Sequence, residues 1–537
     1  MRTSANLRSR ITKILPVFFS RRYGHSSWPE VLILAAWAAI VLFQATRHVM
    51  WRDEVRALSI ALTGDSFFAM LTTLHGEGHP AIWYMLLRAA YSVFGSVVVL
   101  PGLAFAIAIA TVGMLIFRSP FPRILIIILL ASRCFVYEYS VMARNYGVGA
   151  LLMFVIAAAY RSRRDRGILL GALLFLLANT NLIAAIMVAP FLLFWLLDIL
   201  AETGVRWTPK LANFVLNALI ATAGVVICAL TILPTFNDAA ARDWSQASPA
   251  IAALNAVVNP GYTTPGTLFS PGLPSVVGSL LLFGMTLGLL PKRSAFVAAL
   301  VSLILFSLFS AIAAQGDARH AMVWLCFCVM LYWISWNDIT EALAKLSPTR
   351  PGKSVFQAGC IALLLVLALQ AEAGFLGVAR AMIGGGVESR SADLGSLIRQ
   401  RPELANAVVI AEPDYMAEAL PYYASNRTYL LREGRFGNFI RFTKSGKLDT
   451  NLGEILQVSR ELQKTTSSPI IIVLQYNIEK IIPDRLYKVG YNWTFTASKG
   501  DIKNFLDGTI RMAQFDEAQS DESYDVYLLR HDDQHGL

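Results

Sequence analysis

The chain has 537 residues, of which 55% are hydrophobic and 15% charged, and its mean hydropathy is +0.53. This composition excludes an ordinary soluble globular protein and predicts an integral membrane protein, embedded in the lipid bilayer. The formal net charge of +10 would suit a nucleic-acid-binding protein. Most Lys and Arg residues of the first 375, however, lie in short loops between apolar runs, where they orient a membrane protein, so we expect no nucleic-acid partner.

Residues 1–29 are basic, and their apolar stretch is too short for the core of a secretory signal peptide, so they predict a retained cytoplasmic tail. Residues 30–375 carry apolar runs that recur at the length of membrane-crossing helices. We expect about eleven transmembrane helices, near residues 31–49, 95–117, 124–138, 145–160, 167–179, 182–200, 212–234, 273–290, 294–314, 320–336 and 355–375.

An odd number of spans puts the two ends of the chain on opposite sides of the membrane, and the positive-inside rule assigns the N-terminus to the cytoplasm. The outer side then receives the loops 50–94 and 235–272 and the segment 376–537. The loop 235–272 is rich in Pro, Gly and Asn and is long enough to act as a mobile lid. Basic inner loops and an outer segment without cysteine fit the bacterial inner (plasma) membrane, with a periplasmic C-terminal domain.

The segment 376–537 alternates β-like and helix-like patterns and predicts a soluble α/β domain. Strands are expected in "NAVVIAEPD", "RTYLL", "PIIIVL", "YKVGYNWTFTAS" and "SYDVYLLR". Helices are expected in "SADLGSLIRQ", "DYMAEALPYYA" and "LGEILQVSRELQKT". No Gly-rich phosphate loop is present, which argues against a nucleotide site.

The first candidate site residues are Asp53 and Glu54 in "MWRDEVRALS", directly after the first apolar run. Adjacent carboxylates at the mouth of a span are costly unless they are solvated, paired or used in function. They could form a solvated interfacial pair balanced by Arg52 and Arg56. On a helix Asp53 and Arg56 could pair and leave Glu54 on another face, and a carboxylate in a partly dry pocket could act as a general base.

The stretch "HGEGHP" places His75, Glu77 and His79 two residues apart. On a strand all three would share one face and could hold a metal, whereas on a helix only the two histidines would. The spacing is not that of the HExxH motif, so no metal is predicted, and the three residues are candidate substrate contacts.

The helical pattern "AIWYMLLRAAYSVFG" follows and spaces Trp83, Tyr84, Arg88 and Tyr91 along one helix. This mixture of aromatic and cationic side chains fits a helix lying at the membrane surface, and simple anchoring explains it equally well. Tyr84 and Arg88 are the candidate substrate contacts in this helix.

Two further outer turns are dense in polar residues. "YEYSVMARNYGVGALL" contains Tyr137, Glu138, Arg144 and Tyr146, and an arginine beside tyrosines at a helix end could hold a lipid phosphate. "QGDARHAMVWL" repeats the arrangement with Arg319 and His320, although Asp317 and Arg319 could also form an ordinary surface pair.

Taken together, the acidic pair, "GEGHPAIWYMLLRAAYSVFG", "ARNYGVGALL" and "DARHAMVWL" resemble the membrane-embedded GT-C glycosyltransferases. The most similar members are those that use polyprenyl-phosphate sugars, namely the lipid A aminoarabinose transferase, protein O-mannosyltransferases and rhizobial lipopolysaccharide galacturonosyltransferases. The resemblance covers the membrane region and, more loosely, "PDYMAEALPYYASNRTYLL". It implies a polytopic α-helical membrane protein of GT-C fold with a C-terminal soluble α/β domain.

By this resemblance Asp53 is the catalytic carboxylate, with Glu54 beside it. His79 and Pro80 match the family's His-Pro motif, and Arg144 and Tyr146 match its Arg-x-Tyr near the donor phosphate. Arg319 matches a basic residue of a late outer loop. This chain has His320 where many relatives have Tyr, and "GHPAI" replaces the commoner His-Pro-Pro, so the sugar and the acceptor stay open.

The function expected from the resemblance is an inverting transfer of a sugar from a polyprenyl-phosphate donor to a cell-envelope glycan, glycolipid or protein at the periplasmic face. No cofactor is predicted, and a need for a divalent cation is left open. A transporter or flippase of lipid-linked saccharides is the alternative, but it should carry polar groups near the bilayer midplane, where this chain is almost purely apolar. A ligase of O-antigen type is a further alternative.

Overall fold

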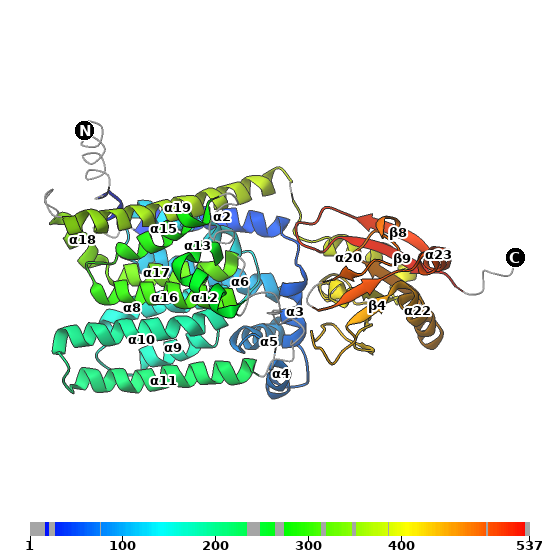
Figure 1. Cartoon of the computed structure of the whole chain (residues 1–537), viewed down its shortest axis with the longest axis horizontal. Helices are drawn as coiled ribbons and strands as arrows, with labels where there is room; N and C mark the ends of the chain where they lie inside the picture. The colour runs from blue at the N-terminus through cyan, green and yellow to red at the C-terminus, as the bar shows by residue number, and fades with distance from the viewer. Residues whose placement is uncertain are drawn as a thin grey trace.

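The computed structural model describes residues 15, 17–20, 27–75, 77–233, 248–263, 273–312, 318–345, 351–384, 386–489 and 492–531, with the side chains of 351–353 left out. A helical region is followed by a mixed α/β domain, which lies against one end of the helices (Figure 1). We call this end, where α2 stops at Arg47 and α19 at Met382, the domain end. The helical region contains α2 (Ser27–Arg47), α3 (Arg52–Ala61), α4 (Phe67–Leu74), α5 (Ile82–Phe94), α6 (Val99–Arg118), α7 (Arg123–Leu130), the π-helix η1 (Cys134–Glu138), α8 (Tyr146–Arg163), α9 (Leu169–Ala178), α10 (Leu182–Thr203), α11 (Pro209–Ile232), α12 (Pro249–Val258), α13 (Pro260–Thr263), α15 (Ser275–Leu287), α16 (Arg293–Ile312), α17 (Ala318–Ile334), α18 (Trp336–Ala344) and α19 (Pro351–Met382).

The protein is a multi-pass membrane protein by helix length and hydropathy. Among the described residues, six helices are long and apolar enough to cross a bilayer: α2, α6, α10, α11, α16 and α19. The pair α17 and α18, bent by 63° at its break, makes a seventh if it counts as one span. These seven match predicted spans. The other four predicted spans correspond to α7 with η1, to α8, to α9 and to α15. These helices are shorter than the six long ones or, for α7 with η1, interrupted.

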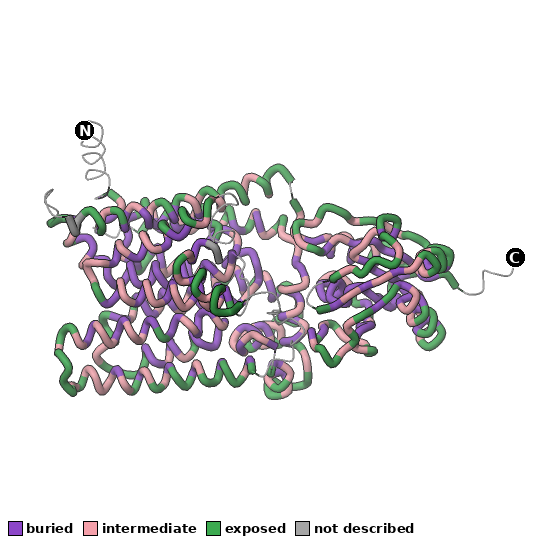
Figure 2. The backbone as a smooth tube through the Cα atoms, viewed as in Figure 1, coloured by how far each residue is buried: buried purple, intermediate pink, exposed green. Residues whose placement is uncertain are grey.

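The core of the helical region is built around α17. All of its side chains are buried except Arg319 and His320 in its first turn. A helix that is apolar on every side belongs inside a bundle, and α8, α10 and α16 pack around it. Figure 2 shows the buried residues running through the middle of the helices, with exposed ones outside. Arg319 and His320, the two residues of α17 that are not buried, therefore both lie at the domain end.

The outer loop predicted for residues 50–94 folds into three short helices, α3, α4 and α5, at the domain end (Figure 1). α5 packs on α3 and α6. Of the predicted lid 235–272, only residues 248–263 are described. They form α12, which packs on α16, and α13, which packs on α15. The rest of the predicted lid and Asp317 lie outside the described residues.

The C-terminal domain confirms the predicted mixed α/β fold and has two sheets. Its larger sheet has the strand order β3-β2-β1-β5-β9-β8, and its smaller sheet the order β4-β7-β6. β1 pairs in parallel with β2 and β5, and the other pairs of the larger sheet are antiparallel. The strands are β1 (Val408–Glu412), β2 (Thr428–Leu430), β3 (Arg435–Phe436), β4 (Asp449–Asn451), β5 (Ile470–Leu474), β6 (Tyr487–Lys488), β7 (Thr494–Thr496), β8 (Thr509–Phe515) and β9 (Tyr524–Leu529).

The helices of this domain are α20 (Ser391–Arg399), α21 (Leu420–Tyr423), α22 (Leu452–Thr466) and α23 (Lys499–Gly508), and its 3-10 turns are η3 (Pro402–Leu404), η4 (Asp414–Ala417) and η5 (Ile478–Lys480). β1 and β5 are buried along their whole length, as the apolar sequence of β5 and the first four residues of β1 require. The fifth residue of β1, Glu412, is buried in a 2.6 Å ion pair with Arg432. The prediction missed β3, β4, β8 and α23. β8 lies at a sheet edge, and its exposed Arg511 and Gln514 interrupt its apolar residues, so its apolar signal is weak.

Candidate active site

The site is organised by α3, which lies between the helical bundle and the C-terminal domain (Figure 1). Its first turn contains Asp53 and Glu54, whose negative charges suit the N-terminal end of a helix. The backbone N–H of Trp51 donates to Glu54 Oε2 at 3.3 Å, which satisfies one group at the helix start. α3 thus begins where the chain leaves the first span, and the side chains of Asp53 and Glu54 point in different directions.

Asp53 lies between two arginines that come from distant parts of the chain. Its Oδ2 is 3.4 Å from Arg144 Nη1 and 3.3 Å from Arg319 Nη2. Arg144 also donates to the backbone carbonyl of Asp53. Arg319 is further held by the ring of Trp51, with 5.4 Å from its guanidinium carbon to the ring centre. The structure therefore brings together three residues that the sequence analysis singled out separately.

These arginines decide the protonation of Asp53. Burial raises its pKa, but the charges of Arg144, Arg319 and Arg52 outweigh burial and lower the pKa from 3.8 to about 2. The side chain is 27% exposed, so it still reaches open space. Asp53 is a carboxylate at neutral pH, accessible and close to two cations.

Glu54 faces away from this site. It is fully buried, and it accepts hydrogen bonds from the backbone N–H of Ala143 at 2.6 Å and from Trp51. Its Oε2 is also 2.8 Å from His48 Nε2, and His48 Nδ1 is 3.1 Å from the hydroxyl of Tyr137. Glu54 therefore fastens α3 to the segment before α8, and the structure places it outside the Asp53 cavity.

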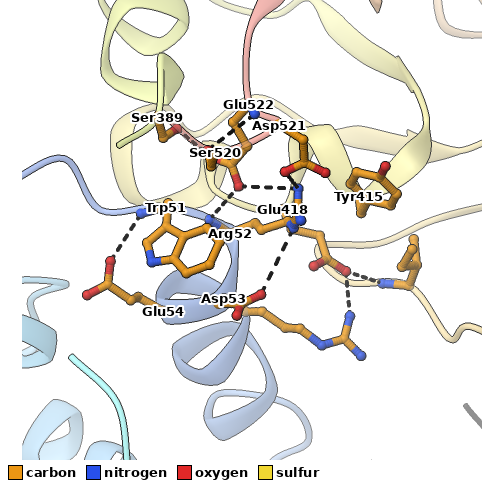
Figure 3. A network of polar contacts seen from close by, with 12 residues as sticks. Trp51, Arg52, Asp53, Glu54, Ser389, Tyr415, Glu418, Ser520, Asp521 and Glu522 are labelled. Carbon is orange, nitrogen blue, oxygen red and sulfur yellow. Dashed lines mark hydrogen bonds and ion pairs between the residues drawn. The ribbon is translucent and has the colours of Figure 1, made fainter. Parts of the chain in front are cut away.

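Arg56 joins two carboxylates instead of pairing with Asp53. Its Nε is 2.8 Å from Glu77 Oε1, and its Nη1 is 2.5 Å from Glu418 Oε1. The same oxygen, Glu418 Oε1, also accepts from the backbone N–H of Ile440 at 2.8 Å. Figure 3 shows Glu418 close to the first turn of α3, near Arg52. Because Glu418 belongs to the C-terminal domain, this domain contributes a carboxyl group to the wall of the site.

A cavity of ≈ 210 Å³ opens among these groups. It is lined by Arg52, Asp53, Arg56, Ala57, Glu77, His79, Trp83, Tyr84, Arg144, Asn145, Glu418 and Phe442. A second cavity, of ≈ 170 Å³, shares His79 with the first. It is lined by Gly78, His79, Tyr146, Asn181, Leu182, Ile183, Phe309, Ser310 and His320, from helices of the bundle. A charged chamber and a more apolar one thus meet at His79.

The polar residues of the second cavity are ordered by stacking and hydrogen bonding. The hydroxyl of Tyr146 is 2.7 Å from His320 Nε2, and its ring stacks on Tyr139 at 6.0 Å. Tyr139 donates its hydroxyl to the carbonyl of Arg319 at 2.7 Å. Burial, followed by the charge of Arg144, lowers the pKa of His79 to about 3, so its imidazole is neutral at pH 7.

Besides Glu54, four of the predicted site residues lie elsewhere. His75 is exposed at the end of α4. Arg88 donates to the carbonyls of Ala61, Thr63 and Gly64 at 2.7–3.0 Å and closes the end of α3. Tyr137 contacts His48, and Glu138 pairs with Arg133 at 2.7 Å. Among the described residues no three His, Cys, Asp or Glu side chains are grouped to hold a metal ion, and His75, Glu77 and His79 are not brought together.

The residues of the C-terminal domain that contact α3 were not predicted from the sequence. The backbone N–H of Arg52 donates to Glu522 Oε1 at 3.0 Å, and its guanidinium is 2.5 Å from Asp521 Oδ1 (Figure 3). Tyr423 donates to the carbonyl of Met50 at 2.9 Å. Glu418 could have been noticed, since it stands in "DYMAEALPYYA", which was predicted as a helix and is part of the segment that the resemblance covers loosely. Glu418 and Arg56 are more than 350 residues apart along the chain, so the sequence gives no sign that they pair.

Comparisons of the chain with protein-family models, with curated protein sequences and with solved structures found no match. The function is therefore argued from the site itself.

Proposed function

We propose that the protein is a membrane glycosyltransferase that moves a sugar from a polyprenyl-phosphate donor to a glycan, glycolipid or protein of the cell envelope. The observation that supports this most is the placement of Asp53 between Arg144 and Arg319 in a cavity at the domain end of the helices. It is the arrangement needed by a reaction that removes a proton from a hydroxyl beside a phosphate that gains charge.

In this proposal the acceptor hydroxyl attacks the anomeric carbon of the donor sugar while Asp53 takes the hydroxyl proton. The bond from that carbon to the phosphate oxygen breaks, and the electron pair leaves with the polyprenyl phosphate. Arg144 and Arg319 stabilise the charge that develops there. Attack opposite the leaving phosphate inverts the anomeric centre.

The two arginines also explain how Asp53 could become a better base. In the free site they hold its pKa at about 2. A donor phosphate would take over part of their charge, and the pKa of Asp53 would then rise toward the ordinary range. The second cavity, with Leu182, Ile183 and Phe309 in its wall, offers an apolar path from the bundle to the same place.

The finer features of the proposal are a GT-C fold with about eleven crossings, the bacterial inner membrane as location, a cytoplasmic N-terminus and a periplasmic C-terminal domain. In this orientation the domain end, with Asp53, faces the periplasm. The carboxyl group that Glu418 contributes to the cavity wall suits an acceptor that is bound between the membrane and the domain.

The test uses the purified wild type, Asp53→Asn and the matched control Asp65→Asn, which removes an exposed carboxylate of the same outer segment. Each protein is incubated with radiolabelled polyprenyl-phosphate sugars and a crude envelope extract, and loss of label from the lipid is followed. We expect turnover by the wild type and the control, and a rate about 10²–10⁴-fold lower for Asp53→Asn. Near-normal transfer by Asp53→Asn would show that the base is another group. Movement of intact labelled lipid across the bilayer, without transfer, would favour the transporter.

A further inference from the structure

A separate cavity of ≈ 310 Å³ lies where the domain ends of α2 and α19 meet η1 and the segment leading into the C-terminal domain. We call it the α2–α19 cavity. It shares no lining residue with the two cavities around Asp53. Its volume is within the range of about 300–1,000 Å³ that is typical of ligand sites. The proposed function above makes no use of it.

Three arginines from three separate elements line this cavity: Arg47 at the end of α2, Arg133 just before η1 and Arg380 in the last turn of α19. Arg133 pairs with Glu138 at 2.7 Å, and its side chain stays 46% exposed. Arg47 and Arg380 form no ion pair with any residue that the structure describes. Convergent arginines without carboxylate partners are suited to an anion.

The cavity wall contains one acidic residue, Glu388, and three arginines, so its charge is positive even when Glu388 is ionised. Burial raises the pKa of Glu388, and the charge of His48 opposes this rise. His48, also in the wall, is already engaged with Glu54 and Tyr137. The cavity therefore presents a net positive charge.

The cavity also lies where a lipid headgroup is expected, at the ends of two candidate membrane spans. α2 and α19 are both candidate membrane spans, and the cavity is at their domain ends. Directly along the same helices, apolar side chains are exposed: Leu42 is 49%, Phe375 71% and Leu376 42% exposed. Cationic groups at the ends of helices that also expose apolar side chains match a lipid, whose phosphate and acyl chains are joined in one molecule.

Space for the headgroup is provided by Gly377. A Cβ built at this position would have no heavy atom within 4 Å, whereas a Cβ at Gly374 would meet the carbonyl oxygen of Ala131. α19 therefore packs tightly against the start of the η1 segment at Gly374 and stands clear of its neighbours at Gly377, one turn later. The open position is in the cavity wall.

We propose that the α2–α19 cavity binds the phosphate headgroup of an anionic phospholipid from the leaflet on the domain side, through Arg47, Arg133 and Arg380, with the acyl chains lying along α2 and α19. The bound lipid connects the membrane to α3, because His48 in the cavity wall contacts Glu54. The lipid is thus placed to stabilise the segment on which Asp53 stands, without taking part in its chemistry.

The test measures lipid binding and needs no enzymatic activity, so its outcome is independent of the proposed function. The purified protein is titrated with phosphatidylglycerol or phosphatidylcholine and examined by native mass spectrometry. Arg47→Gln/Arg380→Gln removes the two free charges, and Gly377→Leu fills the cavity while keeping them. The controls are Arg118→Gln, an exposed arginine at the opposite end of α6, and Gly102→Leu, another glycine with open space around its Cβ.

We expect the wild type and both controls to retain one phosphatidylglycerol in preference to phosphatidylcholine, and both test variants to bind it about tenfold or more weakly. Thermal unfolding of each variant checks that it is folded. Equal retention by the folded test variants would overturn the proposal, and so would an equal loss in Arg118→Gln. Displacement of the lipid by excess inorganic phosphate would instead identify a site for a free anion and overturn the lipid assignment.

Discussion

Asp53 and Glu54 are neighbours in the chain with opposite surroundings. Asp53 faces a cavity and two arginines, whereas Glu54 is fully buried and accepts hydrogen bonds from Ala143 and Trp51. Successive residues of a helix point about 100° apart, so one turn can serve catalysis with one residue and structure with the next. The pair should therefore be separable by mutation.

We predict that Glu54→Ala destabilises the protein by about 3–5 kcal/mol, because it leaves the N–H of Ala143 and the buried His48 without their partner. Asp53→Asn should change stability much less, since its side chain borders open space. Thermal unfolding of the two purified variants in the same detergent checks this difference. Equal unfolding midpoints would show that Glu54 does not hold α3 in place.

At the scale of elements, the helices meet at glycines that allow close backbone contact. In the pair α9 and α11, a Cβ at Gly224 would lie 2.6 Å from Phe175 Cα, and a Cβ at Gly171 would lie 2.9 Å from Asn217 Cα. Asn217 adds a hydrogen bond at this contact, from the N–H of Gly171 to its Oδ1 at 2.7 Å. Small residues and interhelical hydrogen bonds replace the hydrophobic effect as the source of helix association in a membrane.

We predict that Gly224→Leu lowers the free energy of unfolding by about 1–3 kcal/mol or more, because backbone atoms of α9 would have to move. The matched control is Gly113→Leu in α6, where a Cβ meets no atom within 4 Å. The unfolding midpoints of the two variants in detergent give the comparison. If both fall equally, the effect comes from the added leucine and not from the α9–α11 contact.

At the scale of the whole molecule, α3 is held from both sides. On the bundle side Glu54 contacts Ala143, and on the domain side Arg52 and Arg56 contact Glu522 and Glu418. Burial raises the pKa of both of these domain glutamates from 4.5 to about 7, against the opposing charges of Arg56 and Arg52. The contact between domain and helices therefore depends on pH.

A raised pKa in the folded state means that folding favours the protonated form. The stability contributed by Glu418 and Glu522 is thus fully present below about pH 4.5 and is lost as the pH rises through about 7. We predict that the unfolding midpoint of the wild type falls by about 5 °C between pH 5 and pH 8, relative to Glu418→Gln/Glu522→Gln. The control Glu403→Gln/Glu517→Gln, at exposed positions, should follow the wild type. A wild type whose midpoint changes no more than that of Glu418→Gln/Glu522→Gln would contradict this linkage.

The sequence predicted much of this protein because its strongest signals are local. Long apolar runs such as those of α10 and α16 need no partner to be recognised, and the same holds for the buried strands β1 and β5. The motifs around Asp53, Arg144 and Arg319 were also visible, since charged residues at the ends of apolar helices are costly without a use. Signals broken by polar residues, as at β8, were missed.

By itself, the sequence determined a membrane protein with a C-terminal α/β domain and a short set of charged residues at the ends of its helices. Only the tertiary structure decided which of them meet. In the structure Asp53 lies beside Arg144 and Arg319, and Arg56 pairs with Glu418. Glu54 is buried and holds α3 in place. His75 and Arg88 lie outside the site. The reason is physical: spacing along one helix fixes the direction of a side chain, but its partner comes from helices and a domain that packing brings together from far along the chain.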